Sequence, residues 1–418
     1  MRILAVLSRI PFPLNDGGAL LSYNTLVQLH NAGHELHILS LNTKKHYQSP
    51  DVLQDIACSV QTVDVDTDIH VLDALQSLLM RRSYIASRFD HHECGMLLNA
   101  MLSSHRFDIV HLDHTLMSWY AAVVAAYRRS ASCILPKVVL RTHNVEYIIQ
   151  ERLAERETIM LKRWYRRYEA SLLREFEQRA MEYCDGVIAI TSRDAERIRR
   201  LGYAKPLAVV PAGVNTTLYT IQNAVLSDSP LHSVQLCYIG GMDWIPNVEA
   251  MRYFVEKVMP CVRQALPNCT LHIAGKHMND EILHFARKYP DVFAYEDVPS
   301  AKEFLQARDI LVVPLLSGGG MRLKIIEAMA LGVPVISTRV GVEGIAACDG
   351  EHVVLAETPE EFVRAIQQLC FDASMRRRIV QAARTLVEEQ YTWEAVVRRQ
   401  LDFYEQLITG AISQELYE

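Results

Sequence analysis

Three charged residues, Arg322, Lys324 and Glu327, follow the glycine run 318–320 at a spacing suited to binding a nucleotide. A cation at a helix N-terminus is repelled by the positive end of the helix dipole, which destabilises the helix by roughly 0.3–1 kcal/mol. Two cations kept at this position together with loop amides therefore indicate a site for an anion. Glu327 projects from nearly the same face as Lys324 and could accept two hydrogen bonds from a vicinal diol such as ribose. The pattern predicts a nucleoside diphosphate site. The alternative is that both cations are solvated and Glu327 only pairs with Lys324.

The elements around these residues would position them correctly. Residues 309–316 form an apolar run typical of a buried strand, and residues 323–331 have the composition of a helix that Gly332 ends. Residues 333–338 read as the next strand. A strand, a glycine loop, a helix and a strand make one parallel unit, whose ligands bind at the carboxyl end of the strand.

The stretch GGGMRLKIIEAMALGVPVIST (residues 318–338) resembles the retaining GT-B-fold glycosyltransferases of glycosyltransferase family 4, in a glycine-rich bacterial version. THNVE (142–146) and PAGVNTTLY (211–219) support the resemblance, which runs over nearly the whole chain. It implies a nucleotide-sugar donor, with Glu327 on the ribose and Arg322, Lys324 and the loop at the diphosphate. Many family members carry a donor-sugar glutamate where this sequence has Gly319.

The resemblance also implies a fold. We expect an α/β protein of GT-B type, with two Rossmann-like doubly wound domains facing a central cleft. Residues 1–219 would form the N-terminal acceptor domain, 220–233 a linker and 234–392 the donor domain. The final segment, 393–418, would cross back onto the first domain.

In the first half, the loop 8–18 carries Gly17 and Gly18 before a helix, and RTHN (141–144) follows the strand 137–140. Either loop alone could be an ordinary turn; the resemblance places both at the cleft, with His143 facing the donor sugar. The candidate catalytic residues are His143, Arg322, Lys324 and Glu327. The candidate donor-binding residues are Gly17, Gly18, Gly240, Gly241, Gly318, Gly319, Gly320, Met321, Arg322, Lys324 and Glu327, and candidate substrate-positioning residues are Arg141, Asn144 and Glu343.

Composition excludes several other classes of protein. The net charge of −6 argues against a nucleic-acid partner, and no sequence matches a P-loop or a G-x-G-x-x-G dinucleotide loop. Nine scattered cysteines, a short N-terminal apolar run and no apolar stretch of about 20 residues predict a cytoplasmic protein. The acidic run Asp64, Asp66 and Asp68 lacks EF-hand spacing, so we expect a solvated loop, no metal and no cofactor.

A continuous helix is predicted over 145–183, which contains no glycine or proline. Lys162, Arg163, Arg166 and Arg167 would share one face and several aromatic residues the other. Such a helix could lie on the inner face of an anionic membrane as a peripheral contact, but a domain-packing helix with a solvated basic side is slightly favoured.

The predicted reaction is transfer of a sugar from a nucleotide-diphosphate donor to a hydroxyl of a sugar, lipid-linked or protein acceptor, with retention of configuration. Two alternatives stay open. One is a nucleotide-sugar 2-epimerase of the same fold. The other is a non-catalytic partner subunit that keeps the nucleotide site, an alternative that remains because Gly319 replaces the donor-sugar glutamate.

Overall fold

The computed structural model describes residues 1–411 except 15, 69, 131–134, 222–229 and 232. It divides the chain into two compact units: unit 1 comprises Met1–Pro211 and Val396–Glu418, and unit 2 comprises Ala212–Ala395. Most of the predicted linker 220–233 falls outside the described residues. Among the residues that are described, no helix is long and apolar enough to span a membrane.

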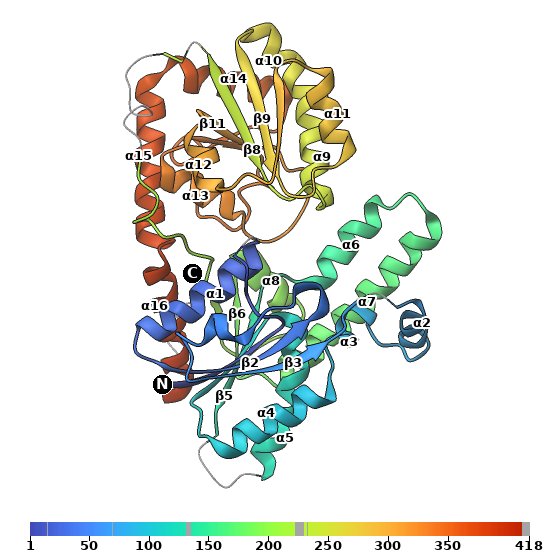
Figure 1. The fold of residues 1–418 in the computed structure, drawn as a ribbon. Coiled ribbons are helices and arrows are strands. Elements are labelled where there is room, and N and C mark those ends of the chain that lie inside the picture. Colours follow the sequence, from blue (N-terminus) through green and yellow to red (C-terminus); the bar gives the residue numbers. More distant parts are fainter. Residues whose placement is uncertain (15, 69, 131–134, 222–229, 232, 412–418) are drawn as a thin grey trace. The chain divides into compact units, whose positions relative to one another are not determined.

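Unit 1 is built on a seven-stranded, all-parallel sheet with helices on both of its faces (Figure 1). In spatial order its strands are β3 (Ser59–Val65), β2 (Glu35–Thr43), β1 (Arg2–Leu7), β4 (Ile109–Asp113), β5 (Lys137–Thr142), β6 (Gly186–Ala189) and β7 (Leu207–Val209). Its helices are α1 (Gly17–Asn31), α2 (Val71–Leu79), α3 (Tyr84–Ser87), α4 (His92–Ser104), α5 (Trp119–Ser130), α6 (Glu146–Arg156), α7 (Met160–Glu182), α8 (Ser192–Arg200) and α16 (Trp393–Thr409).

Unit 2 is built on a six-stranded, all-parallel sheet. Its strands in spatial order are β10 (Val292–Glu296), β9 (Cys269–Gly275), β8 (Val234–Ile239), β11 (Ile310–Val313), β12 (Val335–Ser337) and β13 (Val354–Leu355). Its helices are α9 (Ile245–Tyr253), which continues through a π turn (Phe254–Val258) into α10 (Met259–Ala265), then α11 (Asp280–Lys288), α12 (Ala301–Gln306), α13 (Leu323–Leu331), α14 (Pro359–Phe371) and α15 (Ala373–Gln390). Helices α9 and α11 lie on one side of the sheet, and α13 and α15 on the other (Figure 1). The two sheets confirm the predicted pair of Rossmann-like domains.

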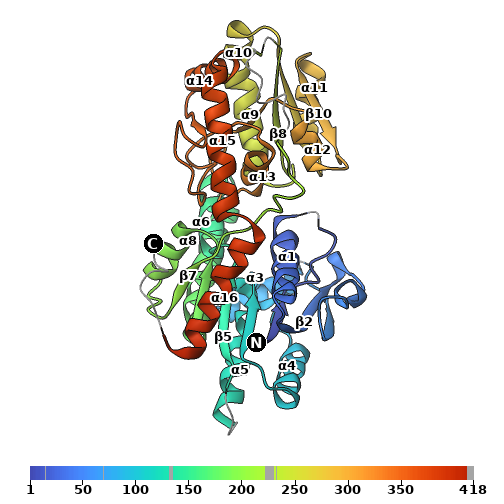
Figure 2. The same cartoon turned by 90° about the vertical axis from the view of Figure 1, so that its left-hand side faces the viewer.

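The division between the units differs from the predicted one at residues 212–219, which belong to unit 2. The Val214 N–H donates to the Tyr391 carbonyl at 2.7 Å, and Gly213 lies directly against Trp393. The C-terminal helix α16 packs on unit 1 from residue 396 onward, where the Tyr404 hydroxyl lies 2.7 Å from His111 Nδ1 (Figure 2).

The single helix predicted over 145–183 is wrong, because residues 157–159 break it into α6 and α7, which pack against each other as a hairpin (Figure 1). Glu157 and Ile159 adopt extended ψ angles of 124° and 114°. The Glu157 carboxylate accepts from the Ile159 N–H at 3.2 Å, and its carbonyl accepts from Arg163 Nε at 2.7 Å. The break depends on these side-chain contacts rather than on glycine or proline, so sequence composition did not signal it.

Two buried glutamates of α7 cap other helices. The Glu177 carboxylate accepts from the N–H groups of Glu146 and Tyr147 at 2.9 and 3.3 Å, at the start of α6. Glu169 does the same for α3, accepting from the Ser83 hydroxyl at 2.5 Å and the Ile85 N–H at 3.0 Å. Because α6 has no side-chain cap of its own, α7 supplies the acceptors that its first turn needs.

We predict that Glu169→Ala lowers the free energy of unfolding by about 2–4 kcal/mol, since it leaves several buried donors without their acceptor. Urea denaturation would measure the change. The matched control is Glu175→Ala on the same helix, where the side chain is 59% exposed and pairs with Arg179 only at 3.6 Å. A loss as small as that of the control would contradict the capping role.

Candidate active site

In both units, the glycine loops that carry candidate residues leave the sheet at the point where strand order reverses, whereas residues 141–144 follow β5, the strand next to that point in unit 1. In unit 2 the first strand, β8, has β9 on one side and β11 on the other; in unit 1, β1 lies between β2 and β4. Loops that follow such a pair of strands diverge and leave a crevice at the carboxyl edge. The predicted strand and helix around residues 309–331 are confirmed as β11 and α13, although β11 is shorter than predicted.

The glycine loop of unit 2 needs its glycines. Gly318 and Gly320 have φ angles of 123° and 75°, which side chains rarely permit. A Cβ atom on Gly318 would also lie 2.6 Å from Arg322 Nη2. The loop therefore wraps closely around the arginine that follows it. Met321 packs against the core of the unit.

Arg322 has a different position from the one expected. Its Nη1 donates to the carbonyls of Gly319 and Gly320, its guanidinium lies 5.4 Å from the Trp244 ring centroid, and the residue is only 5% exposed. These contacts hold the glycine loop in place. They also assign Trp244 a partner, which sequence reasoning did not find.

Lys324 lies between the loops that follow β8 and β11. Its Nζ is 4.1 Å from the centroid of the Tyr238 ring, and a Cβ atom on Gly240 would come within 2.7 Å of it. Burial, reinforced by the charge of Arg322, lowers the pKa of Lys324 to about 7, while Glu327 opposes the shift. The residue is half-buried, so its ammonium group is held in a partly desolvated position, where a bound anion would stabilise its charge.

Asn247 fixes the β8 loop. Its Nδ2 donates to the Gly241 carbonyl at 2.7 Å, and its Oδ1 accepts from the Tyr238 hydroxyl at 2.5 Å. Gly275 lets the same loop approach the neighbouring strand, because a Cβ atom there would lie 1.8 Å from the Gly240 carbonyl oxygen. The loop geometry consequently depends on residues outside the glycine motif.

Glu327 lies one helical turn further along α13. Its Oε1 accepts from the Tyr219 hydroxyl at 3.2 Å, and burial raises its pKa. Glu343 follows β12 in the turn 341–344 and is 8% exposed. Unit 2 therefore brings Lys324, Glu327 and the two glycine loops together at one edge of its sheet.

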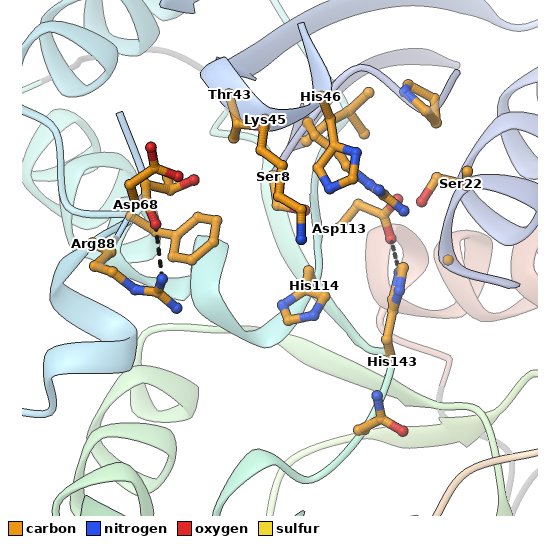
Figure 3. Close-up of a pocket in the computed structure, with 18 residues that line it drawn as sticks. Ser8, Ser22, Thr43, Lys45, His46, Asp68, Arg88, Asp113, His114 and His143 are labelled. Atoms are coloured by element: carbon orange, nitrogen blue, oxygen red, sulfur yellow. Dashed lines mark hydrogen bonds and ion pairs between the residues drawn. The ribbon is translucent and has the colours of Figure 1, made fainter. Parts of the chain in front are cut away.

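In unit 1, the buried Asp113 carboxylate organises the carboxyl edge (Figure 3). Asp113 Oδ1 accepts from both Arg141 Nε and His143 Nε2 at 2.8 Å. Burial alone would raise the pKa of Asp113, but Arg141 and His143 hold it well below its usual range. Arg141 is itself 1% exposed and donates to Thr25 Oγ1 at 2.6 Å, so it supports Asp113 from beneath rather than reaching a substrate as expected.

A cavity of about 380 Å³ opens above this cluster, and His143 and Asn144 line it together with Gly18 (Figure 3). A Cβ atom on Gly18 would lie 3.7 Å from His143 Nδ1, an ordinary contact distance, so the loop passes directly beside the imidazole. The adjacent Asp16 carboxylate caps α1 through the Ala19 N–H at 3.0 Å and binds Arg9. Further polar side chains on the cavity wall are Ser8, Arg9, Ser22, Thr43, Lys45, His46, Thr67, Asp68, Arg88 and His114.

His114 is a cavity residue that sequence reasoning missed. It has a φ angle of 101°, unusual for a residue with a side chain, and its ring lies 5.1 Å from that of His143. Its Nδ1 accepts from the Leu116 N–H at 3.2 Å, and burial lowers its pKa to about 3, so the imidazole is neutral with Nε2 carrying the proton. That Nε2 lies 3.7 Å from Glu146, whose pKa burial raises to about 7. The only sequence signal was the place of His114 directly after β4.

Metal-ligand geometry occurs elsewhere. Within the described part of the chain, two groups bring ligand atoms together: Glu35 with His37 and Cys58, and Cys348 with Glu351 and His352. The first already uses Glu35 in an ion pair with Arg2 at 2.8 Å. Neither group includes a candidate site residue, and neither includes Asp64, Asp66 or Asp68.

Comparison with known proteins agrees with this geometry. Residues 16–218 match the family model "Glycosyltransferase Family 4", and residues 233–372 match "Glycosyl transferases group 1". An uncharacterised 44.6 kDa protein in the cps region of Klebsiella pneumoniae is 22% identical over 93% of this chain and 96% of its own length. The lipopolysaccharide core biosynthesis glycosyltransferase LpsE of Rhizobium meliloti is 26% identical over 54% of this chain and 64% of its own. The structure of Anabaena HepE in complex with UDP superposes with a TM-score of 0.67 over 97% of this chain and all of that one, at 11% identity.

Two all-parallel Rossmann-like units with glycine loops at their switch points, together with the likeness to HepE, show the GT-B fold. Since the two family models together span most of the chain, the protein belongs to the GT-B glycosyltransferases related to family 4, as the resemblance predicted.

We predict that Asp113→Asn lowers the free energy of unfolding by about 3 kcal/mol at neutral pH, because it leaves the buried Arg141 guanidinium without a counter-charge. The depressed pKa of Asp113 means that its contribution is complete at neutral pH and lost as pH falls through that pKa. Urea denaturation at several pH values would test both points. Asp64→Asn, at an exposed position on β3, serves as the control.

Proposed function

We propose that the protein transfers a sugar from a nucleotide-diphosphate donor to an acceptor hydroxyl with retention of configuration, in the synthesis of a bacterial glycan, polysaccharide or glycolipid. The observation that carries the proposal is the desolvated Lys324 ammonium, held between the loops after β8 and β11 beside the N-terminus of α13. A partly desolvated cation gains most from a ligand that concentrates negative charge, and a diphosphate leaving group does so as its bond to the sugar breaks.

The leaving diphosphate would be stabilised by the protein alone. Lys324, the backbone N–H groups of the glycine loop and the positive end of the α13 dipole together supply positive charge at one place. Arg322 acts by holding the loop, since its Nη1 is bound to loop carbonyls. We therefore propose that transfer needs neither a metal ion nor a cofactor, with Glu327 binding the ribose diol.

Unit 1 would bind the reacting sugar and the acceptor. His143, oriented by Asp113 at 2.8 Å, lines the same cavity as Asn144, and His114 adds an imidazole N–H. These groups suit the hydroxyl groups of sugars, whether the acceptor is a free, lipid-linked or protein-linked glycan.

The relatives support the donor and the pathway. HepE was solved with UDP and also with UDP-glucose, and LpsE is named for lipopolysaccharide core biosynthesis. We propose a UDP-sugar as the first donor to test and a cytoplasmic location, which the scattered cysteines favour.

The proposal is tested by incubating the purified protein with UDP-, GDP- or ADP-sugars, with and without oligosaccharide acceptors. NMR should show a glycoside with the anomeric configuration of the donor, and nucleotide release that depends on acceptor. Lys324→Ala should lower kcat/KM by about 100-fold or more, as expected for loss of a leaving-group contact. Lys257→Ala, at an exposed position of unit 2, should behave as wild type.

Other outcomes of this experiment separate the rival functions. An epimer formed from donor alone would instead establish a 2-epimerase. Tight nucleotide binding without turnover of any donor would instead indicate a non-catalytic subunit.

A second prediction follows from the lowered pKa of Lys324. Below a pH of about 7 the ammonium is already charged, whereas above it donor binding must recharge the amine. At about pH 8, binding should take up roughly 0.9 of a proton, and affinity should fall up to about tenfold per further pH unit. Titration calorimetry in two buffers of different ionisation enthalpy measures this uptake. Lys324→Arg, which stays charged, should bind without uptake, and zero uptake by the wild type would contradict the assignment.

A further inference from the structure

The tip of the α6–α7 hairpin exposes large apolar side chains. Ile159, Met160, Leu161 and Trp164 are 51%, 82%, 74% and 54% exposed. They occupy the turn and the first five residues of α7, and the hairpin projects from the body of unit 1 (Figure 1). Single exposed apolar residues are ordinary on a protein surface, but four within six positions form a continuous patch.

The remainder of α7 behaves differently. Leu172 and Leu173 are 6% and 0% exposed, and the buried carboxylates Glu169 and Glu177 fix the helix to α3 and α6. Packing within unit 1 therefore explains the apolar residues from about 169 onward. Packing does not explain the exposed apolar residues at 159–164, so these residues have no role if the helix serves only to pack within the domain.

Positive charge surrounds this patch. Residues 156–168 contain five basic side chains and one acidic side chain, in a protein whose net charge is −6. Lys162 and Arg167 are exposed, while the acid, Glu157, pairs with Arg166 at 3.4 Å. Trp164 stacks on Tyr168 with ring centroids 5.7 Å apart and planes 6° from parallel. An apolar and aromatic face flanked by lysine and arginine is complementary to the boundary between acyl chains and anionic headgroups.

We propose that this hairpin tip binds the surface of an anionic lipid bilayer, with Met160, Leu161 and Trp164 inserted below the headgroups and Lys162 and Arg167 among them. Long basic side chains can extend to phosphates while their stems cover apolar surface. Helix α2 strengthens the proposal: it contacts α3, which contacts α7, and it exposes Leu72 and Leu79 at 80% and 84%. Figure 1 draws α2 on the same side of unit 1 as the hairpin.

The choice of a bilayer over a protein partner follows from the charge pattern. Interfaces between proteins deplete charged residues at their core, and they bury an apolar centre against a shaped partner surface. Here the apolar residues form the end of a projecting hairpin, and positive charge lies beside them. A negatively charged surface that is fluid and apolar beneath its headgroups meets both features at once. The inference concerns where the protein binds, so it is independent of the proposed reaction.

The test is co-sedimentation of the full-length protein with vesicles of phosphatidylcholine alone or with one third phosphatidylglycerol. We expect at least tenfold more binding to the anionic vesicles, a loss of that binding as salt rises and a blue shift of tryptophan fluorescence. Met160→Glu with Leu161→Glu should reduce binding at least tenfold. Lys162→Glu with Arg167→Glu should abolish the preference for phosphatidylglycerol.

The matched control is Met96→Glu with Ile408→Glu, since these residues are 55% and 42% exposed elsewhere on unit 1. This variant should bind vesicles as the wild type does, and all variants should keep the wild-type melting temperature. No vesicle binding, or equal loss in the control, would overturn the proposal. Self-association by light scattering that the Met160 and Leu161 changes remove would overturn it in favour of a protein interface.

Discussion

Keeping charged groups out of water at the carboxyl edges of two parallel sheets is the constraint on which this structure depends. In unit 1, Asp113 is buried with Arg141 and His143, and the attraction between these groups outweighs the desolvation that would otherwise protonate the carboxyl. In unit 2, Lys324 is desolvated against Tyr238 with only partial compensation from Glu327. The first arrangement is satisfied within the protein, and the second is left for a ligand to complete. Unit 1 thus holds a carboxylate neutralised by its neighbours, and unit 2 holds an incompletely neutralised cation.

Close backbone approach makes the second arrangement geometrically feasible. The Gly240 carbonyl occupies the space that a side chain on Gly275 would fill, and Gly240 in turn leaves room for Lys324 Nζ. Asn247 then ties the loop to Tyr238, whose ring receives the ammonium. The glycines at the ends of β8 and β9 thus determine how near a cation can come to the sheet, which is a packing role.

Helix α7 combines two roles along its length. Its buried glutamates supply acceptors to the first turns of α3 and α6, the latter beginning at Glu146 of the THNVE segment. Its first turn, by contrast, presents apolar residues to solvent. The helix thereby connects the base of the His143 loop with an outward-facing surface. The contacts by which it caps α6 and α3 join residues about 30 and 85 positions apart in the chain.

The sequence by itself determined the parallel unit over residues 309–338, with its glycine loop and the helix Leu323–Leu331, because local composition and periodicity encode them. It also placed Lys324, Glu327 and His143 at strand ends, where a parallel sheet gathers its ligands. Only the tertiary structure decided that Arg322 folds back onto the loop carbonyls, that Arg141 lies beneath Asp113 and that His114 joins the cavity. The break at residues 157–159 was likewise decided by contacts to Glu157. The physical reason is common to all four: the direction of a long polar side chain depends on which acceptors neighbouring strands and helices bring to it, and that information is not local in the chain.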